Sequence, residues 1–420
     1  MPAQVPKSPP LIFGIPSEVL QEILLLCHPR DVAAFCGTCQ SGGDRGMDQY
    51  LWRQLFLGLF DVPPNVDSCR WRCELSARMK AERDVCRAGR QDAGLSEADL
   101  RAALETLVIV AAQISDANDS TDSLPSRNAE WLNNVLHKSR ILDTPSSLSK
   151  DCQYVDRLRT YMALSLHEND DESIRRIRTQ SRCFIYDLRN YHEANSWGPY
   201  LGDKINWTHL NYVVNVIVTN LREQPALNLP IPPHGLAATR AYSAPGSRSP
   251  EDWAGVEGTW HRYVSFMDYR DLFAFNFGGI LANHRDPAFF DNLHFREATR
   301  LIELTLHLIP REEMRIKFST NDPPVATHPD YPTLYFSGTS RGISMLHLQP
   351  TVQGLVYMDL DGIPRWKFTS MQSSTPQWSS EGVQLGKPGS QMGLAGVWSA
   401  FGHDRDDPAG PFWAWKVSSD

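Results

Sequence analysis

The spacing of apolar residues changes between the two halves of the chain. From residue 11 to about residue 225 they recur at helical spacing, interrupted by polar stretches such as 115–128, which cannot supply a core face. Between residues 302 and 308, four apolar side chains alternate with polar ones, the pattern of a strand with one face in solvent. The sequence therefore predicts an α+β multidomain protein with an all-α N-terminal part and a β C-terminal part.

Further apolar runs in the C-terminal part are bounded by Gly or Pro. They predict strands near 333–336, 352–360, 366–368, 382–385, 397–401 and 412–417. Strands this short and closely spaced form a sandwich or a barrel. We expect a closed antiparallel β-barrel, because pairing of the aromatic last run with a first strand at 256–266 would leave no open edge.

Prolines separate the two parts. Six of them lie between residues 225 and 250, where they exclude a regular helix or a central strand and favour an extended path. This arrangement predicts a compact helical module at 11–60, a helical connector at 61–224, a Pro-rich linker at 225–250 and a β-barrel at 251–420.

Composition and charge narrow the class of protein. The 420 residues carry a net charge of −8 and are 41% hydrophobic, values of a globular protein with room for two or three domains. Basic residues are interspersed with acidic ones, so we expect no nucleic-acid partner. No apolar run approaches the ~20 residues that cross a bilayer, so we expect no membrane partner.

The cysteines and the N-terminus indicate the compartment. All eight cysteines lie at or before Cys183, which is unusual for a secreted protein stabilised by disulfides. The N-terminus lacks the charged-then-apolar layout of a signal peptide. We therefore expect an intracellular protein of the cytoplasm, the nucleus or both.

The pairs Cys36/Cys39 and Cys69/Cys73 imitate a four-thiolate zinc site. Cys36 and Cys39 fall on the apolar face of a short predicted helix, however, where a thiol behaves as a small hydrophobe. The chain also lacks a phosphate loop, a dinucleotide-binding glycine motif and a His-Glu-x-x-His motif. We therefore expect no metal, no cofactor and no catalytic residue.

Three short apolar helices are predicted in the first 60 residues. The first starts at Pro16, the second starts at Pro29, and the third covers 50–56. Together they carry more apolar side chain than so small a bundle can bury internally, so part of this surface should be an interface.

This order of elements resembles the F-box, over residues 13–56. The resemblance consists of an apolar-Pro-x-Glu start at 15–18, Ile23-Leu24 with further leucines, a Pro-x-Asp-apolar second helix from Pro29, and Leu51-Trp52. It departs from the family after Gln40, where Ser-Gly-Gly-Asp replaces a basic stretch with a Trp. An ordinary helical hairpin that packs on its own domain is the alternative.

The resemblance implies that the helices bind the linker protein Skp1, which connects to a cullin and a ubiquitin-charged conjugating enzyme. The chain would then be a non-catalytic subunit that acts by proximity. By matching positions, the implied Skp1 contacts are Ile15, Pro16, Val19, Leu20, Ile23, Leu24 and Val32.

The C-terminal part resembles the last domain of a group of fungal F-box proteins at 377–386, 396–398 and 410–416. More distantly, 331–339 together with Trp366 is similar to the substrate-receptor barrel of animal F-box-only proteins that target cyclins. These resemblances imply an eight-stranded calycin-like barrel with a substrate pocket at one end.

Candidate contacts with a protein substrate are two predicted loops, at 337–341 and 403–407, and tryptophans that either line a pocket or fill the barrel. The candidate residues are Ser337, Thr339, Arg341, Trp366, Trp378, His403 and Trp413. We expect Trp260 and Trp398 in the core. The aromatic-rich segment 186–207 either caps the barrel or contacts a partner.

The resemblances together imply the substrate-recognition subunit of a Skp1–cullin–F-box ubiquitin ligase. It would bind Skp1 through the F-box and a protein target of unknown identity through the barrel. One alternative is a small-ligand-binding β-barrel protein with a helical interaction domain. Another is a Skp1-bound protein outside any ligase.

Overall fold

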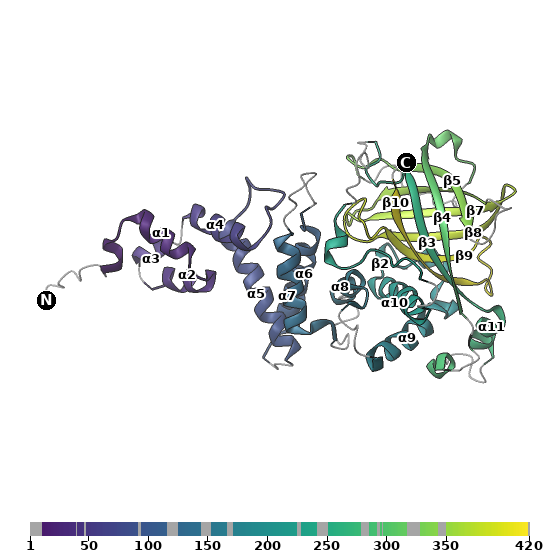
Figure 1. Cartoon of the computed structure of the whole chain (residues 1–420), viewed down its shortest axis with the longest axis horizontal. Coiled ribbons are helices and arrows are strands. Elements are labelled where there is room, and N and C mark those ends of the chain that lie inside the picture. The colour runs from purple at the N-terminus through teal and green to yellow at the C-terminus, as the bar shows by residue number, and fades with distance from the viewer. Residues whose placement is uncertain are drawn as a thin grey trace. The chain divides into compact units, whose positions relative to one another are not determined.

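The computed structural model shows helices in the N-terminal half of the chain and a barrel of strands in the C-terminal part (Figure 1). It describes residues 11–38, 40–45, 48–90, 94–115, 125–143, 153–165, 171–224, 228–241, 251–278, 285–291, 295, 297–316, 328–342 and 350–418. The described residues up to Ser139 form one compact unit, and those from Arg140 onward form a second. None of the described helices is both long and apolar enough to cross a membrane.

The N-terminal unit is all-helical. Its elements are η1 (Leu11–Gly14), α1 (Ser17–Leu25), α2 (Pro29–Cys36), α3 (Gln40–Arg45), α4 (Gln49–Leu59), α5 (Trp71–Gly89), α6 (Glu97–Ala112) and α7 (Arg127–Ser139). Local sequence explains where they begin, since Pro29 occupies the first turn of α2 and Asp48 accepts a hydrogen bond from the Tyr50 N–H at the start of α4. Ser96 caps α6 in the same way through the Asp99 N–H.

A buried arginine joins four helices of this unit. The Arg78 guanidinium of α5 lies 4.6 Å from the ring centre of Phe56 and 4.5 Å from that of Phe60. It donates hydrogen bonds to Gln113 Oε1 at 2.6 Å and to Asn128 Oδ1 at 3.1 Å. Because these partners come from α4, α7 and the end of α6, the three helices after residue 60 belong to the same unit as α1–α4.

The boundary between the units lies inside the predicted helical connector. Helices α5–α7 pack with the N-terminal helices, whereas the helices after Arg140 pack with the barrel. The connector 61–224 is therefore divided at residues 139 and 140 instead of forming a domain of its own. The helical periodicity of the segment is the same on both sides of this point, so it carries no sign of the division.

The C-terminal unit contains both helices and strands. Its elements before the barrel are η2 (Ile141–Asp143), α8 (Tyr154–Met162), α9 (Asp171–Ile185), η4 (Leu188–Asn190), η5 (Glu193–Asn195), β1 (Tyr200–Leu201), β2 (Lys204–Ile205), α10 (Trp207–Glu223) and η7 (Leu236–Thr239). Helix α10 is buried along nearly its whole length, because α8 and α9 pack on one side of it and the barrel wall packs on the other. It forms the middle layer of this unit.

Eight antiparallel strands close into a barrel, so the predicted closure is confirmed. The strands are β3 (Gly258–Met267), β4 (Glu297–Ile309), β5 (Leu334–Gly342), β6 (Thr351–Met358), β7 (Pro364–Gln372), β8 (Thr375–Gln384), β9 (Leu394–Ala400) and β10 (Ala409–Ser418). Every run predicted as a strand overlaps one of them. Strand β10 pairs with β3, and Phe412 lies opposite Val264. Between the strands lie α11 (Tyr269–Phe277), η8 (Pro287–Asp291) and η9 (Arg311–Glu313).

Aromatic side chains fill one end and the middle of the barrel. The ring centres of Phe336 and Trp366 are 5.7 Å apart, and both side chains are 1% exposed. Glycines on facing strands make room for the rings, since a Cβ on Gly354 would lie 2.4 Å from Phe336 Cζ and one on Gly382 would lie 3.0 Å from Phe412 Cζ. This part of the interior is a packed core.

Polar side chains fix α9 and α10 to the outside of the barrel. Asn220 of α10 donates hydrogen bonds to Ser265 Oγ of β3 at 3.1 Å and to Thr299 Oγ1 of β4 at 2.9 Å. Arg182 of α9 donates to the Asn220 side-chain oxygen and forms an ion pair with Glu297 of β4. Since these groups are buried and paired, the helices have one position on the barrel wall.

Part of the predicted Pro-rich linker packs on the barrel. In η7, Leu236 and Ala238 are buried, and the Ala238 carbonyl accepts a hydrogen bond from the Met392 N–H. Leu236, Ala238 and Ala241 of this segment bury apolar surface on the unit, whereas Ile231 is 65% exposed. Residues 242–250 of the predicted linker lie outside the described residues.

We expect that a chain ending after Gly410 aggregates or unfolds. It lacks most of β10, which leaves the edges of β3 and β9 unpaired. It also lacks Phe412, Trp413 and Trp415, and burial of such side chains contributes about 1.5–3 kcal/mol each against a net stability of about 5–15 kcal/mol. Size-exclusion chromatography and thermal unfolding test this. The control is a chain ending after Ser418, and a monomeric truncated chain with the control's melting temperature would contradict a closed barrel.

Candidate functional site

Helix α1 exposes an apolar stripe. Val19 is 49% exposed, Ile23 is 42% exposed, and Leu26 at the end of the helix is 90% exposed. These positions are four and three residues apart, so their side chains share one face. Pro16 at the start of the helix is exposed as well. We call these four residues the α1 face. An exposed aliphatic stripe of this kind is typical of a protein-binding surface.

The opposite side of α1 belongs to the core of its own unit. Leu20 is 1% exposed, Leu24 is 5% exposed, and Val32 of α2 is fully buried. All three pack with α4 and α5. This corrects the prediction that they contact Skp1, because side chains this deeply buried stabilise the helical module itself. Of the remaining predicted contacts, Pro16, Val19 and Ile23 lie on the α1 face and Ile15 is half-buried.

The C-terminal unit contains a cavity of about 420 Å³ outside the barrel. Three segments that are distant in sequence form it: the loop and short helices at 188–197, the end of α11 with Arg285, and the connection between β9 and β10. Its lining residues are Leu188, Arg189, Tyr191, His192, Trp197, Asn276, Phe277, Arg285, Ser399, His403, Asp404, Arg405, Asp407 and Ala409. We call this the lateral cavity.

One wall of the lateral cavity is a stacked pair of rings. Trp197 and His403 lie parallel, with ring centres 4.0 Å apart and an interplanar angle of 9°. Both residues have positive φ, 52° and 54°, a conformation that packing must stabilise for side chains of this size. Burial lowers the pKa of His403, with Asp407 acting in the opposite direction. The imidazole is therefore neutral at pH 7 and stacks as an uncharged ring.

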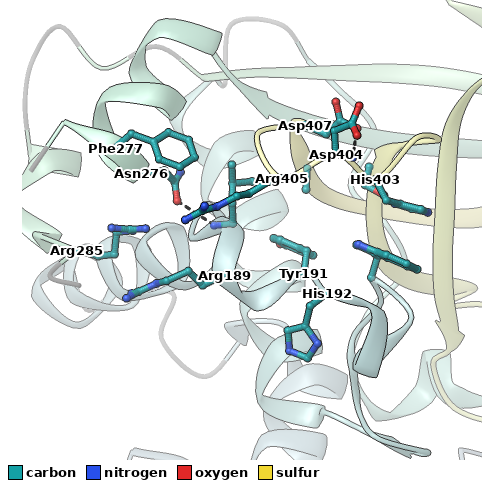
Figure 2. A pocket seen from close by; sticks show the side chains of 14 residues that line it. Arg189, Tyr191, His192, Asn276, Phe277, Arg285, His403, Asp404, Arg405 and Asp407 are labelled. Atoms are coloured by element: carbon teal, nitrogen blue, oxygen red, sulfur yellow. Dashed lines mark hydrogen bonds between the residues drawn. The ribbon is translucent and has the colours of Figure 1, made fainter. Parts of the chain in front are cut away.

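Charge is unevenly distributed around the lateral cavity. Figure 2 shows Arg189 and Arg285 on one side and Asp404 and Asp407 on the other. Arg189 is held by an ion pair with Asp187 at 2.6 Å, and Arg285 lies 3.5 Å from the same carboxylate. Arg405 is exposed and lies between the two sides.

The groups that line the lateral cavity can stack with a ligand and hydrogen-bond to it. His403 Nδ1 lies 3.2 Å from Ser399 Oγ, a distance that suits a hydrogen bond. Aromatic rings flanked by opposite charges suit a peptide segment that carries both apolar and charged side chains.

Two of the tryptophans predicted to contact a substrate are core residues. Trp366 is 1% exposed inside the barrel and donates a hydrogen bond to Gln384. Trp413 is fully buried and donates to the Met392 carbonyl. This corrects their assignment as substrate contacts, since a partner cannot reach them. Trp260 is a core residue as predicted.

The other candidates lie on the surface of the unit but not together. Ser337, Thr339 and Arg341 belong to β5 and not to a loop, and they alternate with residues that face the barrel interior. Trp378 of β8 is 42% exposed. Among the predicted substrate residues, His403 is the one that lines the lateral cavity.

Sequence reasoning located part of the lateral cavity. The aromatic-rich segment 186–207, predicted to cap the barrel or contact a partner, contributes Tyr191 and Trp197. Asn276, Phe277 and Arg285 carried no comparable signal, because they enter the cavity only through the packing of α11 on this unit.

The cysteines of the described residues are free thiols. Burial raises the pKa of Cys36 and of Cys69, so both remain protonated at neutral pH. Cys39, the second member of the first predicted pair, lies outside the described residues. Within the parts of the chain that the structure describes, no three His, Cys, Asp or Glu side chains cluster around a metal position.

No protein-family model, curated protein or solved structure significantly matches the chain. We therefore base the functional assignment on the α1 face, the lateral cavity and the residues that form them.

Shortening side chains on the two sides of α1 should change the free energy of unfolding by different amounts. Val19→Ala with Ile23→Ala should change the free energy of unfolding by less than about 1 kcal/mol, because both side chains are exposed. Leu20→Ala should lower it by about 2–5 kcal/mol, because it opens a cavity in the core. Urea unfolding followed by circular dichroism measures both. Equal losses would mean that the α1 face is packed and not available to a partner.

Proposed function

We propose that this protein is the substrate-recognition subunit of a Skp1–cullin–F-box ubiquitin ligase. The observation that carries the proposal is the α1 face, an uncovered aliphatic stripe on the helix whose sequence resembles the first helix of the F-box. In this proposal Ile15, Pro16, Val19 and Ile23 contact Skp1. The chain needs no catalytic group, since it acts by bringing a target close to activated ubiquitin.

The packing beneath α1 supports this role. Leu20, Leu24 and Val32 attach α1 and α2 to α4 and α5, so the exposed side chains project from a pre-organised helix. A rigid surface binds without first losing conformational entropy. The Arg78 hydrogen bonds extend the same packed unit through α7. The F-box helices would therefore bind Skp1 as part of a larger rigid body.

We further propose that the target protein binds the lateral cavity, with the barrel, taken as calycin-like, as its scaffold. The filled core leaves no room for a polypeptide in the middle of the barrel. The lateral cavity instead offers the stacked Trp197 and His403, together with Arg405 for a charged side chain. Residues on loops carried by a rigid scaffold commonly determine specificity.

Replacing Val19 and Ile23 together by Glu should weaken Skp1 binding at least about 100-fold, because buried aliphatic anchors commonly contribute about 2 kcal/mol or more each. Titration of the full chain with recombinant Skp1 measures this. The control is Ile109→Glu, which changes a side chain of α6 that is 47% exposed in the same unit. Skp1 binding at wild-type affinity by the double variant would contradict the proposal.

The target site has its own test. Proximity labelling under proteasome block should recover target proteins with the Val19/Ile23 variant, which cannot pass them to the ligase. Adding Arg405→Glu should remove those proteins from the labelled set, because it reverses a charge in the lateral cavity. Arg270→Glu is the matched control, since its side chain on α11 is 91% exposed and does not line the cavity. An unchanged set with Arg405→Glu would place the target elsewhere, and failure to recover a cullin with the wild-type chain would place the protein outside a ligase.

A further inference from the structure

The barrel interior contains a buried cation. Arg262 of β3 is 4% exposed and points inward, between the rings of Phe368 and Phe412. Its guanidinium carbon lies 4.8 Å from the first ring centre and 4.4 Å from the second. The cation therefore lies between two apolar faces in the middle layer of the barrel.

Arg262 has few hydrogen-bond acceptors. Its Nη2 donates to Ser380 Oγ at 2.8 Å, whereas its Nε is buried without an acceptor. Within the described residues no carboxylate lies at ion-pair distance, and burial alone lowers its pKa to about 9. Arg182 and Arg365, which are equally buried, both form ion pairs with carboxylates.

A buried charge without a counter-ion is unfavourable, and proteins normally pair it. The two phenylalanine rings stabilise the cation in part, because their faces carry partial negative charge. They supply no acceptor for the Nε–H group. An anion with an oxygen that accepts from the guanidinium edge would satisfy this donor.

Solvent reaches the interior from one end of the barrel. Inward-facing residues beyond Arg262 are partly exposed, among them Val264, Ile302, Ser370 and Trp398. Trp378 stands edge-on to Trp398 at this end, with ring centres 5.2 Å apart. Beyond the opposite side of Arg262, the inward-facing side chains are those of the packed core. A molecule that enters from the open end thus meets Arg300, which lies opposite Val264 on the inward-facing row of β4, and an apolar, aromatic surface before it meets Arg262.

We propose that this end of the barrel binds a small apolar carboxylic acid, with its carboxylate on Arg262 and its apolar part against Trp398, Val264 and Ile302. The Arg262 guanidinium, with the Ser380 hydroxyl beside it, matches the planar geometry of a carboxylate. The hydroxyl of Ser370 lies on the same inward-facing row as Phe368. This inference is independent of the ligase proposal.

Titration of the full chain with octanoic, decanoic and dodecanoic acid, and with their methyl esters, tests the proposal at neutral pH. Calorimetry gives the affinity and the stoichiometry. We expect one acid per chain, bound at least about tenfold more tightly than its ester, because the ester cannot form the charged hydrogen bond. Equal affinity for acid and ester, or no binding of any acid, would overturn the proposal.

Arg262→Met keeps an unbranched apolar stem and removes the guanidinium and its charge. It should abolish the preference for acid over ester while the ester still binds. The matched control is Arg341→Met, since Arg341 is an exposed residue of β5 that lies opposite Glu303 on the outer face of the barrel and its loss should leave the preference unchanged. A persistent preference in Arg262→Met would overturn the proposal, and if this variant does not fold, the comparison of acid and ester on the wild-type chain still decides it.

Discussion

Pairing of β3 with β10 is the interaction on which the C-terminal unit depends. The first and last strands of the barrel are far apart in the sequence, and the entropy lost on closing the loop between them grows slowly with its length. Once formed, the pair gives β10 two buried faces. Phe412 packs in the barrel interior, and Trp413 packs outside it. Closure also fixes the connection between β9 and β10, which supplies His403 to the lateral cavity.

Helix α10 connects the helices outside the barrel to the barrel wall. Its buried amide Asn220 bonds to hydroxyls of β3 and β4 and accepts from Arg182 of α9. Each of these polar groups would be unfavourable if buried without its partners. The result is a layered unit in which α9 and the following segment 188–197 have fixed positions, and the lateral cavity forms where that segment meets the β9–β10 connection.

In the N-terminal unit, some apolar side chains of α1 pack in the core and others are exposed. Leu20 and Leu24 complete the core, and Val19 and Ile23 remain in solvent. A bundle of this size does not have enough interior for all of them. The surplus is concentrated on one face instead of being scattered, which is the property expected of a surface that a partner covers. In the proposed function, Skp1 covers these exposed apolar side chains.

The local pattern of apolar and polar residues was sufficient to predict the helices and strands and the closed barrel. Alternation at 302–308, the Gly- and Pro-bounded runs and the aromatic last strand predicted strands and closure, because periodicity depends on neighbours along the chain. The sequence also predicted an apolar helical module with surplus hydrophobic surface. What only the tertiary structure decided is which side of each element meets a partner element. That decision buried Trp366 and Trp413, divided the connector at residue 139 and brought 188–197 to the β9–β10 connection. Among the described residues, it also left Arg262 without a carboxylate at ion-pair distance. These outcomes depend on contacts between residues far apart in sequence, and no pattern of adjacent residues encodes them.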